Sequence, residues 1–311
     1  MMAASLETQN RSRRSRYARD PGAAPRALTP AQIRALLTVA NFRLVSLPQL
    51  VRLHGLSPKG VQRGMRALFD AGLVDVIPVP RALLAGPEDA NDATLLYGSA
   101  PNLYAPTRAG LKLLHENGMI GEARSGAIYG PKNSLFLRHE IQVRDARVWL
   151  LRAAAHRPGG GVLAWYDGSD AAISLERDQA PKQARPDAWF VLRLGSIGGR
   201  EAVLTGLVEA DRGTERGETR WKDKLQAYGA LFAGNRLKTA TGYVNARVLV
   251  VCPDARRRDG LAALIARRAD PALAGRFWLV GRDALNQPDL TRCDWLQAGS
   301  ALLRPLVPSS G

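Results

Sequence analysis

The chain has 311 residues, of which 46% are hydrophobic, and it carries a net charge of +16 at pH 7. This composition can build packed cores, which excludes an intrinsically disordered chain, and the length suits two domains of about 100–200 residues each. No run of about 18 apolar residues is present, so we expect no membrane-spanning helix. The first 20 residues are polar and rich in arginine, so we expect no signal peptide.

The two cysteines, Cys252 and Cys293, are too few for a disulfide framework. This favours a reducing compartment, and we expect a cytoplasmic protein. The four histidines and two cysteines also lack the spacing of a zinc site.

The positive charge favours a polyanionic partner, either nucleic acid or an anionic membrane surface. A basic proteome without a specific partner is the alternative. Residues 1–28 contain an arginine-rich run from Arg11 to Arg19, which predicts a flexible basic arm. A solvated tail without a role is the alternative for this segment.

Three capped helices are predicted after the arm. The first begins at Thr29, and its apolar residues recur at helical spacing. The second begins at Ser46 and ends at Gly55, and the third begins almost at once at Ser57. Two short helices joined by a tight turn that contains glycine are typical of a helix-turn-helix.

The third helix has a polar face that suits DNA. Its apolar residues share one side, while Lys59, Arg63 and Arg66 recur at i, i+4 and i+7 on the other, with Gln62 beside them. Lys and Arg suit phosphates and guanine edges, and Gln suits adenine. These four residues are therefore predicted to contact DNA. A solvated helix face is the alternative.

Two strands and a fourth helix complete the first domain. A strand is predicted at 73–77, a returning strand at 103–104, and a helix from Thr107. The loop at 80–101, rich in turn-forming residues, is predicted to be a wing. Residues 29–117 are therefore expected to form a winged helix-turn-helix that binds double-stranded DNA.

Residues 118–132 include four glycines and show no periodicity, which predicts a linker before a second domain at 133–311. In the second domain, the sequence predicts a helix, three strands, a helix, a strand, a helix and a strand, in this order. This order predicts one mixed sheet flanked by helices, of the α+β or α/β class. The expected helices are 134–155, 219–233 and 261–268, and the expected strands are 162–166, 188–192, 202–210, 247–252 and 277–280.

Acidic residues fall at the ends of two of these strands. Asp187 follows a proline at the start of one strand, and Glu209 and Asp211 stand at the end of the next. Residues at i and i+2 on a strand point to the same face, and clustered carboxylates suit a hard divalent cation. We expect these three to bind Mg²⁺ or Mn²⁺ beside a scissile phosphate. The strand order resembles the core of restriction-endonuclease-like nucleases of the PD-(D/E)XK type.

One departure from that nuclease pattern concerns its lysine. The PD-(D/E)XK motif places a lysine two residues after the second acid, where this chain has Asp211. Lys224 and Lys222 flank the apolar stripe of the next helix on opposite sides, and Lys224 is the marginally better substitute. Alternatively, the acids cap helices or pair with arginines such as Arg212. Glu140 is a further candidate acid, although a surface position is the simpler interpretation.

The chain from Thr29 to Val280 resembles the bacterial replication-relaxation family, which occurs with plasmids and mobile elements. The resemblance rests on the segments LRHEIQVRDARVWL, RPDAWFVL, EADRGTE and KLQAY, which follow the predicted winged helix. It implies a DNA-associated role in plasmid replication or topology, without establishing catalysis.

Two functions therefore remain open. One is a metal-dependent nuclease or nickase directed by the winged helix, since a single nick relaxes a supercoiled plasmid. The other is a non-catalytic DNA-binding regulator whose nuclease-like domain is a scaffold or a dimerisation platform. A role at a membrane surface is disfavoured, because the basic residues fall on the helix-turn-helix rather than along an amphipathic segment. A homodimer is a possible assembly in either case.

Overall fold

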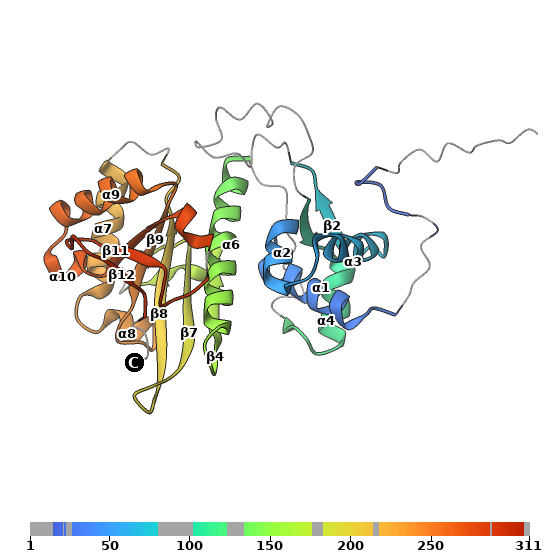
Figure 1. The fold of residues 1–311 in the computed structure, drawn as a ribbon, viewed down its shortest axis with the longest axis horizontal. Helices are drawn as coiled ribbons and strands as arrows, with labels where there is room; N and C mark the ends of the chain where they lie inside the picture. The colour runs from blue at the N-terminus through green and yellow to red at the C-terminus, as the bar shows by residue number, and fades with distance from the viewer. Residues whose placement is uncertain are drawn as a thin grey trace, which may run out of the picture. The chain divides into compact units, whose positions relative to one another are not determined.

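A computed structural model of the chain describes residues 15–20, 22, 27–79, 102–122, 134–175, 183–213, 218–286 and 288–307 (Figure 1). The described residues fall into two compact units, one comprising those up to 122 and the other those from 134 onward. The predicted wing at 80–101, all but residues 118–122 of the predicted linker, and arginines 11, 13 and 14 of the basic arm lie outside the described residues.

The first unit contains four helices and three short strands among its described residues. The strands form an antiparallel sheet in the order β1-β3-β2. In chain order the elements are α1 (Pro30–Phe42), β1 (Val45–Ser46), α2 (Leu47–His54), α3 (Pro58–Asp70), β2 (Val74–Ile77), β3 (Leu103–Pro106) and α4 (Arg108–Glu116).

Local sequence explains where these helices begin and end. The side chains of Thr29, Ser46 and Ser57 each accept a hydrogen bond from a backbone N–H of the following first turn, which satisfies a donor that the helix itself leaves unpaired. Gly55 ends α2 at φ 63°, a left-handed conformation that glycine adopts without strain. The turn between α2 and α3 is therefore set by residues 55–57.

The second unit is built on one large sheet and a two-stranded hairpin of β5 and β6. Its helices are α6 (Ser134–Ala155), α7 (Glu218–Phe232), α8 (Arg236–Thr241), α9 (Ala255–Arg268) and α10 (Pro271–Ala274). Its strands are β4 (Gly160–Asp167), β5 (Ile173–Ser174), β6 (Gln183–Ala184), β7 (Ala188–Ile197), β8 (Arg200–Ala210), β9 (Arg247–Cys252), β10 (Phe277–Gly281), β11 (Asp294–Gln297) and β12 (Leu303–Pro305).

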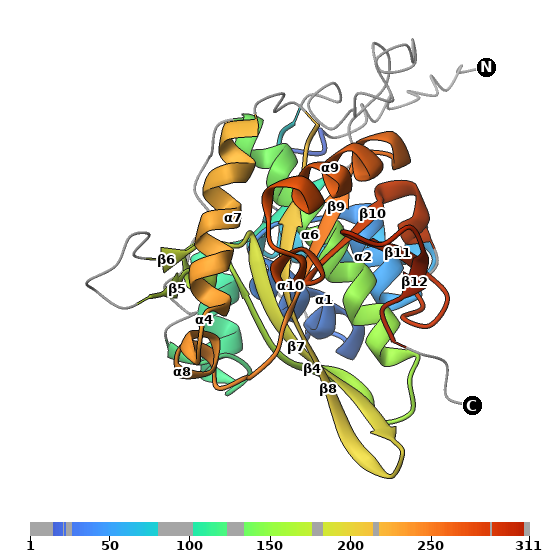
Figure 2. The same cartoon turned by 90° about the vertical axis from the view of Figure 1, so that its left-hand side faces the viewer.

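The large sheet has seven strands in the order β12-β11-β10-β9-β8-β7-β4. The pairs β8–β9 and β9–β10 are parallel and the other four are antiparallel. The predicted mixed sheet with helices is thus confirmed. The sequence patterns do not predict β11, β12 or the β5–β6 hairpin. Figure 2 shows this hairpin beside α7.

Each face of this sheet carries its own hydrophobic core. Helix α6 covers one face, where Trp149 packs near Phe190 and Val208. Helices α7 and α9 cover the other, where Trp221 and Ile265 belong to the same buried cluster as Leu207. Figure 1 shows α6 on one side of the strands and α7 and α9 on the other. A side chain on β8 therefore faces α6 or α7 according to its position in the alternation.

Candidate nucleic-acid interface and carboxylate site

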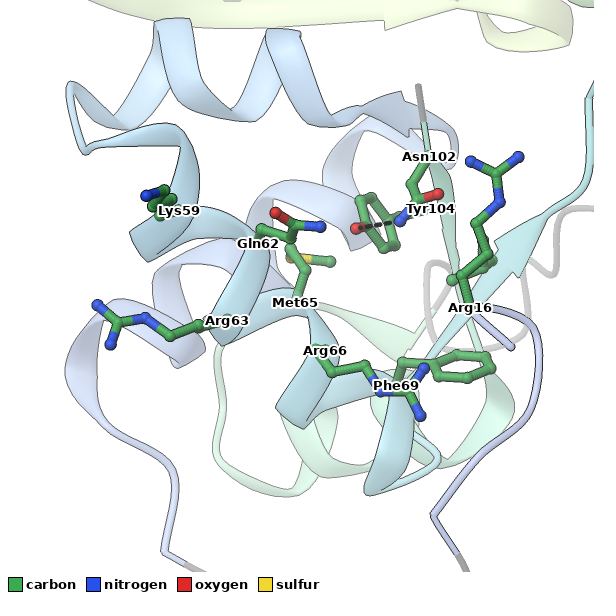
Figure 3. A pocket seen from close by; sticks show the side chains of 10 residues that line it. Arg16, Lys59, Gln62, Arg63, Met65, Arg66, Phe69, Asn102 and Tyr104 are labelled. Atoms are coloured by element: carbon green, nitrogen blue, oxygen red, sulfur yellow. Dashed lines mark hydrogen bonds between the residues drawn. The ribbon is translucent and has the colours of Figure 1, made fainter. Parts of the chain in front are cut away.

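A hollow of about 710 Å³ opens along one face of α3 in the first unit. Helix α3 forms one side of it, and β2, β3, Asn102 just before β3, and Arg16 contribute the rest (Figure 3). None of the described residues that line it is acidic. They are Arg16, Lys59, Gln62, Arg63, Met65, Arg66, Phe69, Val76, Asn102 and Tyr104.

The amphipathic pattern of α3 places its polar residues at this hollow. Val61, Met65 and Leu68 are buried and hold the helix against the unit's core, so the opposite side must face outward. Lys59, Gln62 and Arg63 are exposed there. The structure thus brings three of the four predicted DNA contacts onto one basic, open surface.

Arg66, the fourth predicted contact, also lines the hollow but has protein partners. Its guanidinium forms an ion pair with Asp70 one turn later, with N–O distances of 2.9 Å. Its Nη2 donates to the carbonyl of Ala18 at 2.7 Å, and its Nη1 donates to that of Ser15 at 3.5 Å. The sequence pattern alone does not predict that this guanidinium is engaged by residues of the N-terminal arm.

In the second unit, Asp187 and Glu209 lie at the same end of the sheet, close enough for their charges to interact. Ala188 of β7 pairs with Val208 of β8, and the Asp187 N–H donates to the Val208 carbonyl at 3.0 Å. Asp187 and Ala188 thus both lie at Val208, so the regular register ends there, and Asp187 reaches the next part of β8 through its side chain, which binds the Ala210 N–H.

Asp187 is held from two directions. Its Oδ2 accepts a hydrogen bond from the Ala210 N–H at 2.8 Å, and its Oδ1 lies 2.9 Å from Nε2 of His139 on α6. Burial by itself raises the pKa of this carboxyl. The hydrogen bond and charge of His139, with the charge of Lys224 and the bond from Ala210, outweigh burial and leave the pKa below its ordinary value.

Glu209 is almost fully buried, with a side chain 1% exposed, and binds two residues of α7. Lys224 Nζ donates to Oε2 at 2.5 Å, and the Tyr228 hydroxyl donates to Oε1 at 2.6 Å. Lys224 and Tyr228 are four residues apart, so they share one helix face. The predicted choice of Lys224 over Lys222 agrees with this geometry, since Lys222 is exposed.

The burial of this cluster changes its acid–base behaviour. Burial raises the pKa of Glu209 to about 7, although the Lys224 ammonium opposes the shift. For Lys224, burial lowers the pKa, but the charges of Glu209 and Asp187 outweigh it and raise the pKa overall. Burial and the Glu209 charge raise the pKa of Tyr228 well above its usual value. The site therefore holds a firmly charged lysine beside a carboxyl that titrates near neutrality.

Asp211 does not join this cluster. Arg257 of α9 binds it through two N–H groups, with Nε 2.6 Å from Oδ2 and Nη2 3.0 Å from Oδ1. Within the described part of the chain, no three His, Cys, Asp or Glu side chains are placed to hold a metal ion together. The expected cluster of three carboxylates is thus reduced to Asp187 and Glu209. Asp211 instead pairs with an arginine, as expected if these acids have structural roles.

Three residues that contact the predicted acids, His139, Tyr228 and Arg257, are not predicted from the sequence. His139 stands next to Glu140, the acid considered as a further candidate. Glu140 itself lies 3.6 Å from Arg144 in an ion pair, and its side chain is 15% exposed. Tyr228 belongs to the apolar stripe of its helix, so only its i+4 relation to Lys224 indicates its second role. No local signal links Arg257 to Asp211.

Comparison with known proteins gives one result. A family model described as replication-relaxation matches residues 36–246, about two thirds of the chain. No curated protein and no solved structure matches significantly. None of the helices in the described part of the chain combines the length and the hydropathy of a membrane-spanning segment.

Proposed function

Because this chain belongs to the replication-relaxation family, we propose that its first unit binds double-stranded DNA as a winged helix-turn-helix, with α3 as the recognition helix. Membership in the family suggests a role in the replication or relaxation of mobile elements. The observation that carries the proposal is the hollow along α3, where Lys59, Gln62 and Arg63 are exposed and no described lining residue is acidic.

The position of these residues along α3 supports this role. They lie in its first two turns, directly after the tight turn from α2. A recognition helix enters the major groove with its N-terminal residues toward the base edges. An exposed arginine there reads guanine or binds a phosphate, and Gln62 beside it suits adenine. The net charge of +16 attracts the polyanion over longer distances.

An Arg63→Ala variant is expected to bind duplex DNA about tenfold more weakly, because it loses one charged contact. The slope of log affinity against log salt should become shallower by about one unit, since one fewer counterion is released. Titration of a labelled duplex at several salt concentrations measures both quantities. Lys112→Ala on α4 is the matched control, because that side chain is 75% exposed and outside the hollow. Equal affinity and slope in the two variants would contradict the recognition-helix assignment.

A second candidate function, nicking of DNA, is favoured by the meeting of Asp187, Glu209 and Lys224. Mg²⁺ and Mn²⁺ are commonly held by one or two carboxylates together with water and substrate phosphate. In this candidate function Asp187, just before β7, and Glu209, on β8, would supply two such carboxylates, and the ion would bind the lone pairs that their present hydrogen bonds leave available. When bound, the ion supplies Lewis-acid activation of the phosphate and of water.

The chain's own groups have separate roles in this candidate function. Lys224 keeps its positive charge and neutralises charge that develops on the phosphate. Glu209 holds Lys224 in place through Oε2, and Tyr228 fixes the other oxygen, Oε1. His139 orients Asp187. In this candidate function Lys224 of α7 takes the role that the PD-(D/E)XK pattern gives to a lysine on the strand.

The alternative to nicking is a DNA-binding protein with a non-catalytic nuclease-like scaffold. In that case the ion pair of Lys224 with Glu209 is structural, as the pair of Arg257 with Asp211 is. A homodimer built through the second unit remains a prediction, which light scattering of the full chain would test.

A further inference from the structure

We propose that residues 15–20 form a second wall of the α3 hollow, anchored by Arg66 and Asp70, and that Arg16 contacts the DNA backbone from this wall. The inference rests on the proposed function of the first unit. It gives individual residues roles that the basic composition of the arm alone does not indicate. Arg66 becomes a positioning residue and Arg16 a DNA-binding residue. The partner is duplex DNA that is already engaged by α3.

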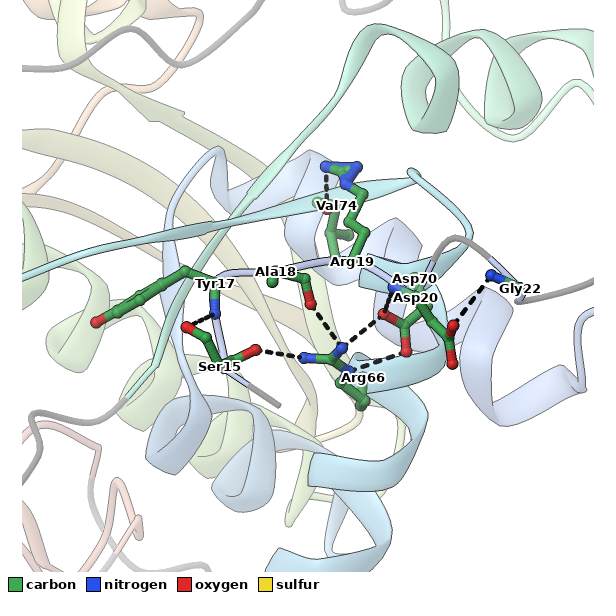
Figure 4. Close-up of polar contacts among 9 residues, drawn as sticks. All are labelled: Ser15, Tyr17, Ala18, Arg19, Asp20, Gly22, Arg66, Asp70 and Val74. Carbon is green, nitrogen blue, oxygen red and sulfur yellow. Dashed lines mark hydrogen bonds and ion pairs between the residues drawn. The ribbon is translucent and has the colours of Figure 1, made fainter. Parts of the chain in front are cut away.

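The first anchor is a pair of side chains at the end of α3. Arg66 donates to the carbonyls of Ser15 and Ala18, which flank the segment carrying Arg16. Asp70 pairs with Arg66 and also accepts a hydrogen bond from the Asp20 N–H at 2.9 Å. Figure 4 shows these contacts converging on one turn of α3. One carboxylate and one guanidinium thus fix the arm at three backbone positions.

The second anchor is Arg19. Its Nη2 donates to the Val74 carbonyl at 3.3 Å and forms an ion pair with Asp75. Its guanidinium lies 4.7 Å from the centre of the Phe69 ring, and that of Arg66 lies 5.3 Å from the same ring. Contacts of this kind stabilise a cation over an aromatic face. The arm is therefore attached to both α3 and β2.

These anchors determine where Arg16 can be. Arg16 lies between the two residues whose carbonyls Arg66 binds, and it lines the hollow with Lys59 and Arg63. Figure 3 shows Arg16 and Arg63 at opposite ends of that hollow. A cation held in place before binding contributes affinity without the entropy cost of ordering a flexible chain. DNA seated on α3 would thus meet a further positive charge, that of Arg16, on the side of the hollow opposite the helix.

The proposed anchoring predicts that removing an acidic residue weakens DNA binding, which is the opposite of what charge alone predicts. Asp70 is an acid close to the proposed DNA surface, so simple electrostatics predicts that its removal strengthens binding to a polyanion. If Asp70 holds the arm, its removal weakens binding instead. We expect Asp70→Asn to lower duplex affinity about three- to tenfold and to reduce the salt slope by about one unit, as loss of the Arg16 contact requires. The substitution spares the helix, because a negative charge at a helix C-terminus is unfavourable.

The matched control is Glu116→Gln, which removes the same charge from the end of α4, where Glu116 is 57% exposed. It should leave affinity unchanged or slightly increased. Arg16→Ala should reproduce the Asp70→Asn defect in the wild-type chain and add little to it in the double variant, since both remove the same contact. Hydrogen exchange at the Asp20 amide, measured without DNA, should be faster in Asp70→Ala, which removes the acceptor oxygen that asparagine keeps.

Three outcomes overturn the inference. The first is tighter or unchanged binding by Asp70→Asn. The second is an additive effect of Arg16→Ala in that background, which would mean that Arg16 acts without the anchor. The third is no duplex binding by the wild-type chain at any salt concentration, which alone would also overturn the proposed function. If the protein still binds DNA, and binding depends on Arg63 but not on Asp70, the proposal of an anchored wall is wrong while the assignment of α3 as the recognition helix stands.

Discussion

Lys224→Met is expected to slow the nicking of supercoiled plasmid by the full-length protein about 10²–10³-fold. This is the usual cost of removing one preorganised group that stabilises developing charge. Lys224 is the cation bound to Glu209, at 2.5 Å, and its charge also acts on Asp187. The measurement is the rate of open-circle product in Mn²⁺ or Mg²⁺, with a chelator as the blank. Product that forms equally in the chelator would contradict a metal-assisted reaction.

Lys222→Met provides the matched control for this prediction. It removes the same charge two residues earlier on α7, from an exposed position, and should nick at the wild-type rate. Tryptophan fluorescence reports on the folding of both variants, because all six tryptophans lie between positions 149 and 295, in the second unit. Equal rates for the two variants would contradict the role of Lys224. If the wild-type protein binds DNA but yields no open-circle product with either ion, nicking is excluded for this substrate. The second unit is then a non-catalytic scaffold.

Glu209→Gln is expected to remove a pH dependence of stability worth about 3 kcal/mol from the second unit. The pKa of Glu209 rises from 4.5 to about 7 on folding, and a tenfold change in proton affinity corresponds to about 1.4 kcal/mol. The folded carboxyl keeps a proton that the unfolded one releases. The contribution of Glu209 to the free energy of unfolding should therefore be fully present below pH 4.5, fall as pH rises to about 7, and be lost above it.

Urea unfolding followed by tryptophan fluorescence, from pH 4.5 to 8 with a chelator present, measures this effect. The difference in stability between wild type and Glu209→Gln should change by about 3 kcal/mol across this window. Asp187 does not interfere, because its pKa is lowered and it titrates below the window. Tyr228→Phe keeps the carboxylate and should retain the pH dependence. Wild-type and Glu209→Gln curves that stay parallel would show that Glu209 does not titrate in this range.

Features that depend on neighbouring residues could be predicted from sequence. The helix starts at Thr29, Ser46 and Ser57 follow from side chains that bond within their own first turn. The outward face of α3 follows from helical spacing. The same spacing favours Lys224 over Lys222, narrowly, and the structure brings Lys224 to Glu209. In each case the information lies within a few turns of one element.

Features that depend on distant segments could not be predicted. Alternation along a strand suggests that Glu209 and Asp211 share a face, and both bind helices that cover the same face, but alternation does not say which helix each acid meets: Glu209 binds Lys224 of α7. Asp211 instead meets Arg257, 46 positions later. Arg66 likewise binds Ala18, 48 positions earlier. A basic residue on an outward helix face looks the same in sequence whether DNA or the chain itself is its partner.

The central claim, that the α3 surface binds duplex DNA, is tested most directly by charge reversal in the full-length protein. Lys59→Glu with Arg63→Glu changes two exposed residues of the hollow, and Arg108→Glu with Lys112→Glu changes two exposed residues of α4. Both pairs lower the net charge equally, so they share any long-range effect. We expect the first pair to weaken duplex binding by about 100-fold or more and the second by only a few-fold. Equal losses would show that net charge, and not the α3 surface, accounts for binding.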